Sequence, residues 1–182
     1  AMVHTPISIK QALSIPDAKA ALEKEWTKLE NLDAWDYASV QPKAKVKERA
    51  IKENRTIHFG GIMDLCHIKH SELDPQFQKY KGRVVFRGDQ TKDQDGVYAV
   101  FSEQGTSASH LSAAKFLDII ARLPDCDGQD SDAIGAYTQV KLADIPSAVE
   151  TRISLPAHRR PPAWKNIEDP VIRLNRNLYG CL

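Results

Sequence analysis

Residues 128–139 read Gly-Gln-Asp-Ser-Asp-Ala-Ile-Gly-Ala-Tyr-Thr-Gln and place two carboxylates two positions apart. If this stretch is an extended strand, its side chains alternate between the two faces, so Asp130 and Asp132 point the same way. Two carboxylates on one face repel each other and need a cation, a proton or separation. A hard divalent ion such as Mg²⁺ suits them, and a polar loop with two solvated aspartates is the alternative.

The charges along the chain are distributed unevenly, although the 182 residues together have a net charge of only +1. Between residues 41 and 92, twelve Lys or Arg residues stand against six Asp or Glu residues. Between residues 93 and 144, nine Asp or Glu residues stand against three Lys or Arg residues. A basic segment beside an acidic one suits a phosphate backbone on one side and a metal ion on the other. A mixed, solvated surface is the alternative.

Two apolar runs upstream of the acidic stretch predict a β-hairpin. Residues 56–70 are expected to form one or two strands, broken at Gly60 and Gly61, and residues 81–87 form a clearer second strand. Because side chains alternate along a strand, the second run separates an apolar face from a basic one. The members of the two faces are Val84 and Phe86 on one side, and Arg83, Val85 and Arg87 on the other.

Amphipathic helices are expected at three places in the chain. The first spans residues 16–31, with an apolar stripe at Ala18, Leu22, Trp26 and Leu29. Trp35 follows in a turn-like segment, and both tryptophans are expected in the core. Residues 43–54 predict a solvated helix with an inward face of Val46, Ala50 and Ile51. A third, largely buried helix is expected to begin at a Ser107 or Ser109 cap and to end before Pro124. Residues 158–162 are expected to form an exposed basic loop.

The order of these segments resembles the reverse transcriptases of the copia-type retrotransposons, from roughly residue 18 to the last residue. Their first catalytic motif is an aspartate, three variable residues, Ala and an aromatic residue, and Asp132, Ala136 and Tyr137 stand at those places. Residues 79–85 are similar to the family's R-Y-K-A-R-L-V strand, with Gly82 in place of its Ala. Residues 151–156 resemble its V-Y-M-x-Q-P segment, and residues 171–180 resemble its C-R-L-x-K-S-L-Y-G-L run.

This resemblance implies an α+β fold, namely the fingers and palm portion of a right-hand polymerase, built from mixed helices and antiparallel strands. Residues 1–15 would be an N-terminal extension, and residues 16–182 a partial reverse transcriptase domain. Within that domain the fingers would span about residues 16–125, and the start of the palm about residues 126–182.

The resemblance also implies the chemistry of RNA- or DNA-templated DNA synthesis. Asp132 would be the catalytic, metal-binding aspartate for Mg²⁺ or Mn²⁺, and the partners would be an RNA or DNA template-primer and a dNTP. Tyr137 would lie under the sugar, and Ala136 would leave room for the nucleotide. Arg83, with Lys81 and Arg87, would face the triphosphate. The alternatives are a core aromatic residue on a strand for Tyr137 and an ordinary exposed basic strand face for the cations.

The other two metal-binding carboxylates of the family lie in a downstream Y-x-D-D motif, which this sequence lacks. Tyr179 is followed instead by Gly180, Cys181 and Leu182. One aspartate is a poor holder for two metal ions, so the chain is expected to be truncated before its site is complete and to be inactive alone. The remaining polymerase segments or another protein would then be its partners.

Two other hypotheses from different functional classes remain open. A non-catalytic module derived from such an element would bind nucleic acid or protein without depending on Asp132 or Mg²⁺. A two-metal nuclease would use Asp130 and Asp132, but it needs further acidic or His ligands that the sequence does not offer at matching places.

Composition indicates the cellular compartment in which the chain is expected. It has no long apolar run that would span a membrane and no secretory signal at its start, so an intracellular (cytoplasmic or nuclear) protein without a membrane partner is expected. Three scattered cysteines indicate reduced thiols. Cys66, His67 and His70 look like part of a metal site, but no second ligand pair with zinc spacing follows.

Overall fold

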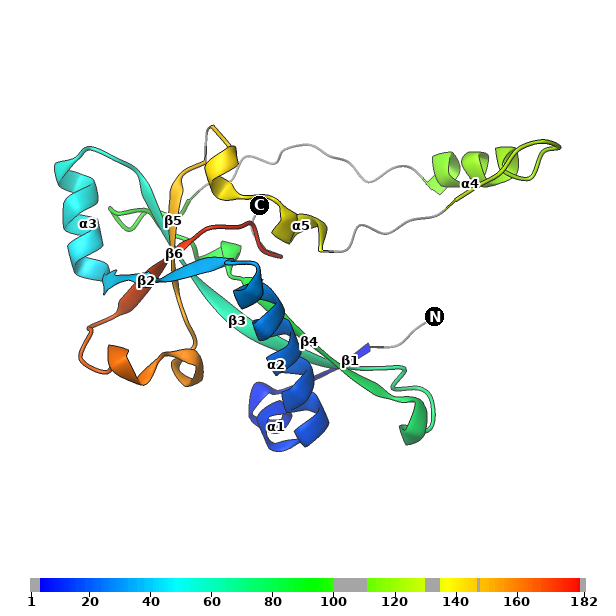
Figure 1. The fold of residues 1–182 in the computed structure, drawn as a ribbon, viewed down its shortest axis with the longest axis horizontal. Coiled ribbons are helices and arrows are strands. Elements are labelled where there is room, and N and C mark those ends of the chain that lie inside the picture. The colour runs from blue at the N-terminus through cyan, green and yellow to red at the C-terminus, as the bar shows by residue number, and fades with distance from the viewer. Residues whose placement is uncertain (1–3, 100–110, 130–134, 147, 181–182) are drawn as a thin grey trace. The chain divides into compact units, whose positions relative to one another are not determined.

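The computed structural model describes residues 4–99, 111–129, 135–146 and 148–180. Within these ranges the chain divides into two units (Figure 1). The first unit comprises residues 1–100 and 137–181, and the second comprises residues 101–136 with residue 182. Each unit is described by itself below.

The first unit is built on a six-stranded mixed sheet with the strand order β1-β3-β5-β6-β2, in which β4 also pairs with β3. Every pairing is antiparallel except the parallel pairing of β3 with β5. The α+β class expected from the sequence is therefore confirmed, with mostly antiparallel strands. The strands are β1 (His4–Ile7), β2 (Trp35–Pro42), β3 (Ile57–Lys69), β4 (Lys79–Phe86), β5 (Glu150–Ser154) and β6 (Pro170–Leu174).

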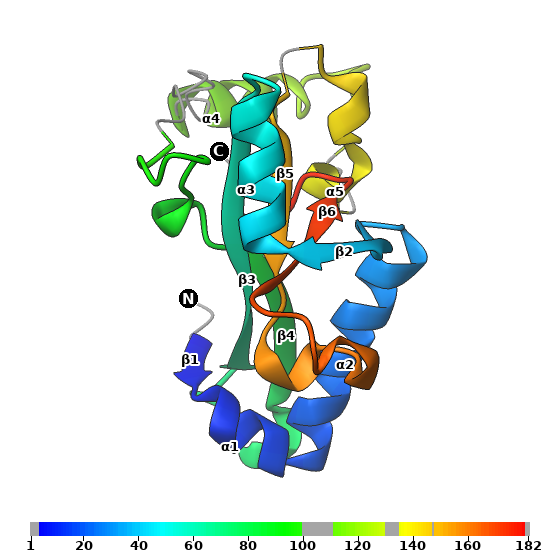
Figure 2. The ribbon, with the colours of Figure 1, turned by 90° about the vertical axis from the view of Figure 1, so that its left-hand side faces the viewer.

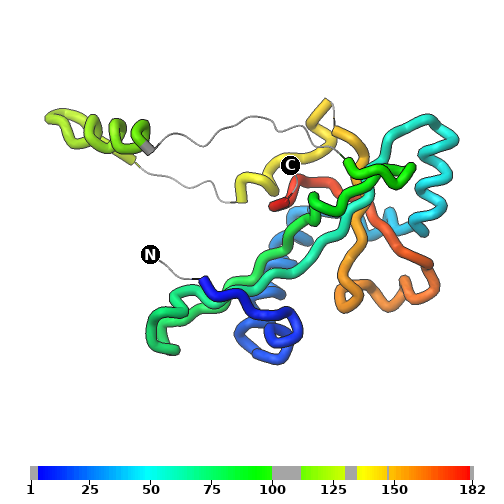
Figure 3. Tube along the Cα trace, turned by 180° about the vertical axis from the view of Figure 1, so that it is seen from behind, coloured from blue at the N-terminus to red at the C-terminus, as the bar shows by residue number. Residues whose placement is uncertain are grey.

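The long strand β3 is continuous through the two glycines at which a break was expected. Residues 57–61 pair with β5, and residues 62–69 pair with β4, so the glycines mark the place where the strand changes neighbour. Figure 3 shows β3 running without a break beside β4. A Cβ atom on Gly60 would lie 2.4 Å from the ring of Phe86. Glycine at this position therefore makes room for a crossing aromatic side chain and does not end the strand.

Five α-helices and several single 3₁₀ turns connect the strands that the structure describes. None of these helices combines the length and apolar character that a membrane crossing requires. The helices are α1 (Ile9–Ser14), α2 (Pro16–Asn31), α3 (Lys43–Lys52), α4 (Leu111–Ile120) and α5 (Ala136–Gln139). The 3₁₀ turns are η1 (Pro75–Phe77), η2 (Gly88–Gln90), η3 (Leu142–Asp144), η4 (Ala157–Arg159) and η5 (Pro162–Trp164).

Helix α2 has the bounds and the buried stripe that its sequence pattern predicts. Pro16 occupies its first turn, where a missing N–H costs nothing, and Asp17 favours the positive end of the helix. All four residues of the stripe are at most 1% exposed. The helix lies along β4 and β3 of the hairpin (Figure 2). A periodic local signal was sufficient here because the buried face is a single stripe.

Helix α3 confirms the second helix expected from the sequence, with one correction. Val46 and Ala50 are buried against Ile57, Phe59 and Val171 in a small core. Ile51 was also expected to face inward, but 59% of it is exposed. It follows Ala50 by one residue, and a rotation of about 100° per residue carries it away from the narrow contact.

Residues assigned to an N-terminal extension contribute two elements of the first unit. Strand β1 pairs antiparallel with the end of β3. Helix α1 begins with a capping box, in which the Ser8 hydroxyl accepts a hydrogen bond from the Gln11 backbone N–H and the Gln11 side chain accepts one from the Ser8 N–H. The predicted boundary between fingers and palm, near residue 125, stays a prediction.

The largest core lies between α2, the sheet and the segment that follows β5. Trp26 and Trp35 meet edge to face there, with ring centroids 5.2 Å apart. The expectation that both are core residues is confirmed, but Trp35 does not lie in a turn. It begins β2 and pairs with Leu174 of β6, a partner far along the chain that its local sequence could not reveal.

The second unit contains helix α4, which ends at Ile120, before Pro124 as expected. Within this unit, Phe116, Leu117 and Ile119 are more than 60% exposed, so the unit does not bury the helix by itself, and the expectation of a largely buried helix stays a prediction. A unit of this length is too short to enclose an apolar helix face by itself. The expected caps Ser107 and Ser109 lie outside the described residues.

Candidate functional site

The acidic stretch that organised the sequence prediction is only partly described. Asp130 and Asp132 lie outside the described residues, so their proposed metal and nuclease roles remain hypotheses. The residues that follow form helix α5 and not the strand expected from the sequence. The last two carbonyl groups of this helix, of Thr138 and Gln139, accept hydrogen bonds from Nη1 of Arg176, each at 3.2 Å. The Arg176 guanidinium group thus supplies donors for the last carbonyl groups of the helix. A strand at this place would instead need a neighbouring strand to pair with.

Strand β4 separates its side chains as the alternation in its sequence predicts. Gly82, Val84 and Phe86 are buried, whereas Arg83 and Val85 are only half-buried on the opposite face. Lys81 belongs to that second face as well, and Arg87 continues it just beyond the strand. The residues of β3 directly opposite Lys81, Arg83 and Val85 are His67, Leu65 and Met63. We call the open surface formed by residues 63, 65, 67, 69, 79, 81, 83, 85 and 87 the hairpin face.

Gly82 explains why α2 approaches the covered side of β4 so closely. A Cβ atom at this position would lie 2.7 Å from the Ala21 carbonyl oxygen and 2.8 Å from the Leu22 backbone. No side chain fits within such distances of a helix backbone. The departure from the Ala of the copia-type pattern therefore has a local packing reason in this chain.

The side chain of Tyr179 joins two residues that the sequence analysis assigned to nucleotide binding. The Arg83 guanidinium carbon lies 4.9 Å from the centroid of the Tyr179 ring, within range of a cation–π contact. The Tyr137 ring lies 5.1 Å from the same ring, at an interplanar angle of 55°. Arg83 and Tyr137 are thus brought together, although β4 and α5 are far apart in the sequence. Tyr137 is 50% exposed, so it is not the buried core aromatic residue of the alternative.

Tyr179 is held in place by its backbone. The Phe86 N–H donates a hydrogen bond to the Tyr179 carbonyl oxygen at 2.7 Å. The next residue, Gly180, has a φ of 89°, and a Cβ atom there would collide with the carbonyl oxygen of Phe86. Only glycine allows the chain to pass so close to the end of β4. The run that resembles L-Y-G-L therefore docks its tyrosine beside the hairpin face.

Arg176 supports the same arrangement from the other end of the segment. Its Nε atom donates to the Leu32 carbonyl oxygen at 2.6 Å, just past the last residue of α2. With its bonds to the end of α5, this one side chain connects α2, α5 and the Tyr179 segment. The position of Tyr137 is therefore supported by a residue to which the sequence analysis gave no individual role.

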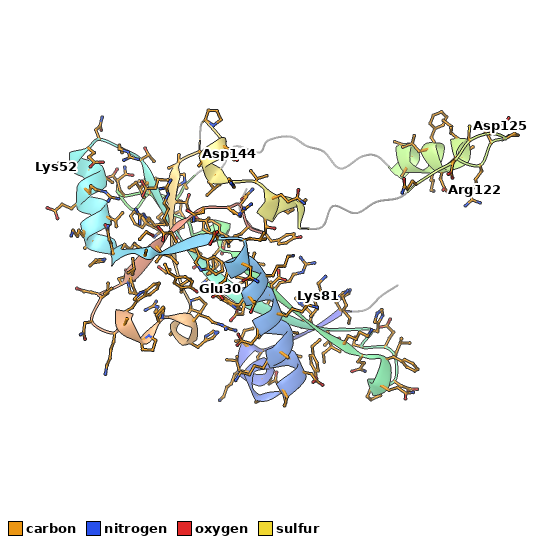
Figure 4. The ribbon with its side chains drawn as sticks, viewed as in Figure 1. Glu30, Lys52, Lys81, Arg122, Asp125 and Asp144 are labelled. Atoms are coloured by element: carbon orange, nitrogen blue, oxygen red, sulfur yellow. The ribbon has the colours of Figure 1, made fainter. Side chains whose placement is uncertain are left out.

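Positive charge on the hairpin face is concentrated around Lys69, Lys81 and Arg83. Burial, together with the positive charges of Arg83 and Lys69, lowers the pKa of Lys81 below its ordinary value. Figure 4 labels Lys81 on the hairpin. Three neighbouring cations form a favourable position for a phosphate. Of the other assigned residues, Arg87 is half-buried beside Gly61, and Ala136 is exposed at the start of α5.

Sequence reasoning missed a polar cluster on the covered side of the hairpin. Asp64 is 5% exposed, accepts a hydrogen bond from the Trp26 Nε1 atom at 2.6 Å, and lies 2.8 Å from the His158 Nε2 atom. The available signal was its place in β3, because alternation puts Asp64 on the same face as Ile62 and Cys66. A carboxylate at a core-facing position requires buried partners.

The loop at residues 158–162 was expected to be an exposed basic loop, and for Arg159 that expectation is wrong. Only 14% of its side chain is exposed. Its guanidinium carbon lies 4.8 Å from the Trp26 ring centroid, and its Nη1 atom donates to Glu23 at 2.8 Å. That hydrogen bond lowers the pKa of the Glu23 carboxyl group below its ordinary value, against the opposing effect of burial.

Within the part of the chain that the structure describes, no group of three or more His, Cys, Asp or Glu side chains is placed to hold a metal ion. The sequence fragment around Cys66 does not form such a site. Cys66 is buried against α1 and α2, and burial raises the pKa of its thiol, whereas His67 points to the opposite face of the strand.

Comparisons of the chain with models of protein families, with curated proteins and with solved structures find no match. Its function must therefore be argued from the sequence and from the geometry above.

Proposed function

We propose that this chain is the fingers and first palm part of a copia-type reverse transcriptase, and that its hairpin face binds a nucleotide and a template-primer. The observation that carries this proposal is the meeting of Arg83 and Tyr137 on the ring of Tyr179. The resemblance assigned the first to the triphosphate and the second to the sugar, and the fold places both beside one aromatic side chain.

The chemistry of this cluster suits a nucleotide. A guanidinium group binds phosphate oxygens in pairs, and its stacking on Tyr179 restricts its motion before any ligand arrives. Tyr137 and Tyr179 offer flat aromatic surface, on which a sugar or a base packs. Lys81 and Lys69 add positive charge to the same face, which supports electrostatic attraction of a phosphate backbone.

The proposed metal ligand is Asp132, and Mg²⁺ or Mn²⁺ would activate the attacking hydroxyl and stabilise the leaving group. A site for two such ions needs more carboxylates than this one. The described ranges hold no ligand cluster that would complete it, and the sequence has no Y-x-D-D motif. We therefore propose binding without DNA synthesis by this chain alone.

Fluorescence anisotropy with a labelled RNA–DNA primer-template tests the binding directly. We expect affinity to fall as salt rises, and Arg83→Gln to weaken binding by about tenfold because a charge-assisted phosphate contact is lost. The matched control is Arg173→Gln, an exposed arginine on β6, which removes the same charge outside the hairpin face. Equal losses from both variants would mean that only net charge matters, and would contradict a specific role for Arg83.

Primer extension with Mg²⁺ or Mn²⁺, beside an Asp132→Ala variant, tests the rest of the proposal. Extension that Asp132→Ala abolishes would overturn the expectation of inactivity. If the chain extends no primer but binds a nucleotide, and this binding requires both Mg²⁺ and Asp132, the result supports the proposed polymerase remnant. Salt-sensitive binding that needs neither Mg²⁺ nor Asp132 would favour the non-catalytic module instead. A chain that binds no nucleic acid or nucleotide would contradict both.

A further inference from the structure

A separate pocket of about 410 Å³ lies in the first unit, away from the hairpin face. It is formed where the end of α2, the start of β2 and the turn after β5 come together; Figure 4 labels Glu30, one of its lining residues. Two aromatic rings, several charged side chains and a proline line it. These residues are Glu30, Asp33, Trp35, Tyr37, His158, Arg159, Arg160 and Pro161.

One edge of the Arg159 guanidinium group has no acceptor among the described residues. Its Nη1 atom donates to Glu23, but its Nε and Nη2 atoms are buried and make no hydrogen bond. These two nitrogens share one side of the planar group, so their N–H bonds point in nearly the same direction. That pair is the edge on which arginine binds two oxygens of a carboxylate or a phosphate. Buried donors without acceptors are costly, so an oxyanion that reached them would be stabilised.

Trp35, another residue that lines the pocket, has a further unsatisfied donor. The residue is 4% exposed, and its Nε1 atom is buried with no hydrogen-bond partner in the part of the chain described. The indole is near enough to Tyr37 to influence its pKa, but it does not donate a hydrogen bond of acceptable geometry to it. Every unsatisfied atom in these two residues is a donor, so the missing partner must be an acceptor.

The acids in the lining limit how much negative charge the ligand carries. The Tyr37 hydroxyl donates to Glu30 Oε1 at 2.7 Å, and burial together with that carboxylate raises the pKa of Tyr37 to about 12. The partner of the Glu30 carboxyl group is thus the neutral Tyr37 hydroxyl and not a cation. Asp33 adds a second negative charge at the α2–β2 turn. A polyanion would be repelled by these two groups, whereas one carboxylate or one phosphate monoester carries less charge to be repelled.

The walls of the pocket suit a flat apolar body behind the anionic group. Trp35 lies 6.4 Å from Tyr37 between ring centroids, and Tyr37 lies 5.8 Å from Trp164, so the aromatic rings form a connected layer. Pro161 adds a further apolar surface. The volume is in the range of ordinary small-molecule sites.

We propose that this pocket binds a small aromatic or apolar oxyanion, whose carboxylate or phosphate is held by the free edge of Arg159 and by the Trp35 indole N–H. The site is independent of the proposed nucleotide-binding function, since none of its lining residues belongs to the hairpin face.

Two-dimensional ¹H–¹⁵N NMR of the full chain locates the binding, because the three tryptophans give separate indole signals. Benzoate, phenyl phosphate and inorganic phosphate are titrated in parallel. We expect benzoate or phenyl phosphate to shift the Trp35 indole signal, which the Trp35→Phe variant identifies by its loss. A response to benzoate assigns a carboxylate ligand, and a response to phenyl phosphate alone assigns a phosphate monoester. An indole signal that none of the three probes moves would overturn the proposal.

Affinities measured by calorimetry separate the proposed contacts. Arg159→Lys keeps the charge but removes the paired donors, and it should weaken binding by about tenfold. Trp35→Phe removes one N–H and should weaken it about three- to fivefold, while the apolar core is retained. Arg173→Lys is the matched control, because this arginine lies on β6 outside the pocket, and its affinity should match the parent chain.

Two variants, Arg159→Lys and Trp35→Phe, are used so that the proposal can still be tested if one of them fails to fold. If Arg159→Lys unfolds the chain, Trp35→Phe still measures one of the proposed contacts. Unchanged affinity in Trp35→Phe together with an unchanged or unfolded Arg159→Lys would contradict the proposed contacts. A probe that binds equally well to Arg159→Lys and to the parent chain would do the same.

Discussion

The two faces of strand β4 differ in chemistry although their residues alternate within a single run of eight. The covered face carries Gly82, Val84 and Phe86, and α2 packs so closely on it that no Cβ atom fits at Gly82. The opposite face carries Lys81 and Arg83, which remain half-buried, and its arginine contacts Tyr179 from the far end of the chain. The difference teaches that one strand can pack against a helix on one face and present cations on the other, because a period of two assigns neighbouring residues to opposite sides.

The largest expected effect comes from Gly82→Ala, which breaks the covered face. Because the new methyl group would meet the backbone of α2 at 2.7–2.8 Å, the helix must move, and we expect the free energy of unfolding to fall by about 3 kcal/mol. Urea denaturation measures the change. The matched control is Gly61→Ala, whose methyl group would meet nothing closer than the Arg87 Cδ atom at 3.9 Å and should change stability by less than about 0.5 kcal/mol. Similar midpoints for both variants would show that the packing is less close than described.

The next effect tests the polar cluster beneath the same face. Asp64→Val removes the acceptor of the buried Trp26 N–H and the partner of His158, so we expect a loss of about 2 kcal/mol. Asp64→Asn keeps an oxygen for Trp26 and should lose clearly less. Met63→Val, on the open face of the same strand, is the control and should be nearly neutral. A neutral Asp64→Val would mean that the cluster adds nothing to stability.

A smaller effect is expected on the open face. Tyr179→Leu removes the contact with Arg83 and the ring contact with Tyr137, which together stabilise the fold by about 1 kcal/mol. The same variant should weaken primer-template binding, because Arg83 loses the surface that orients it. Thermal unfolding measures the loss of stability, and fluorescence anisotropy on the same preparation measures the loss of primer-template affinity. Lower stability with unchanged affinity would place Arg83 outside the binding site.

The smallest effect concerns the pH dependence of stability. The pKa of Lys81 is lowered in the folded chain by burial and by neighbouring cations, whereas the unfolded chain keeps the ordinary value of 10.5. Between these two values the unfolded state binds more protons, so the free energy of unfolding should rise with pH across that window. Lys81→Gln should flatten the rise in urea titrations, and Lys79→Gln, an exposed lysine of the same strand, should leave it in place. A slope that survives Lys81→Gln would assign it to another group.

The features that local sequence predicted correctly share one physical basis. The bounds of α2, the inward residues Val46 and Ala50 of α3, and the two faces of β4 all follow from the periods of helices and strands. The hairpin between β3 and β4 follows because its strands are neighbours in the sequence, separated only by residues 70–78. Each of these depends on residues that are near one another in the chain.

The errors arose where a distant partner decides the structure. Trp35 begins a strand because β6 pairs with it, and Arg159 is buried because Trp26 and Glu23 receive it. Ala136–Gln139 became a helix whose end is satisfied by Arg176. The apolar pattern of α4 predicts a buried face but names no partner to cover it, and the second unit by itself leaves that face exposed.

The sequence by itself determined the α+β class, the first two helices of its prediction, the hairpin and the residue types available for binding phosphate. Periodicity, helix-start signals and side-chain alternation are properties of the local backbone, so they can be read without knowledge of the fold. Only the tertiary structure decided that Arg83 and Tyr137 meet at Tyr179, that Asp64 pairs with His158 across 94 residues, and that Arg159 keeps one edge unsatisfied beside a pocket. Such contacts depend on how whole elements pack, because chain distance places almost no restriction on which side chains finally touch.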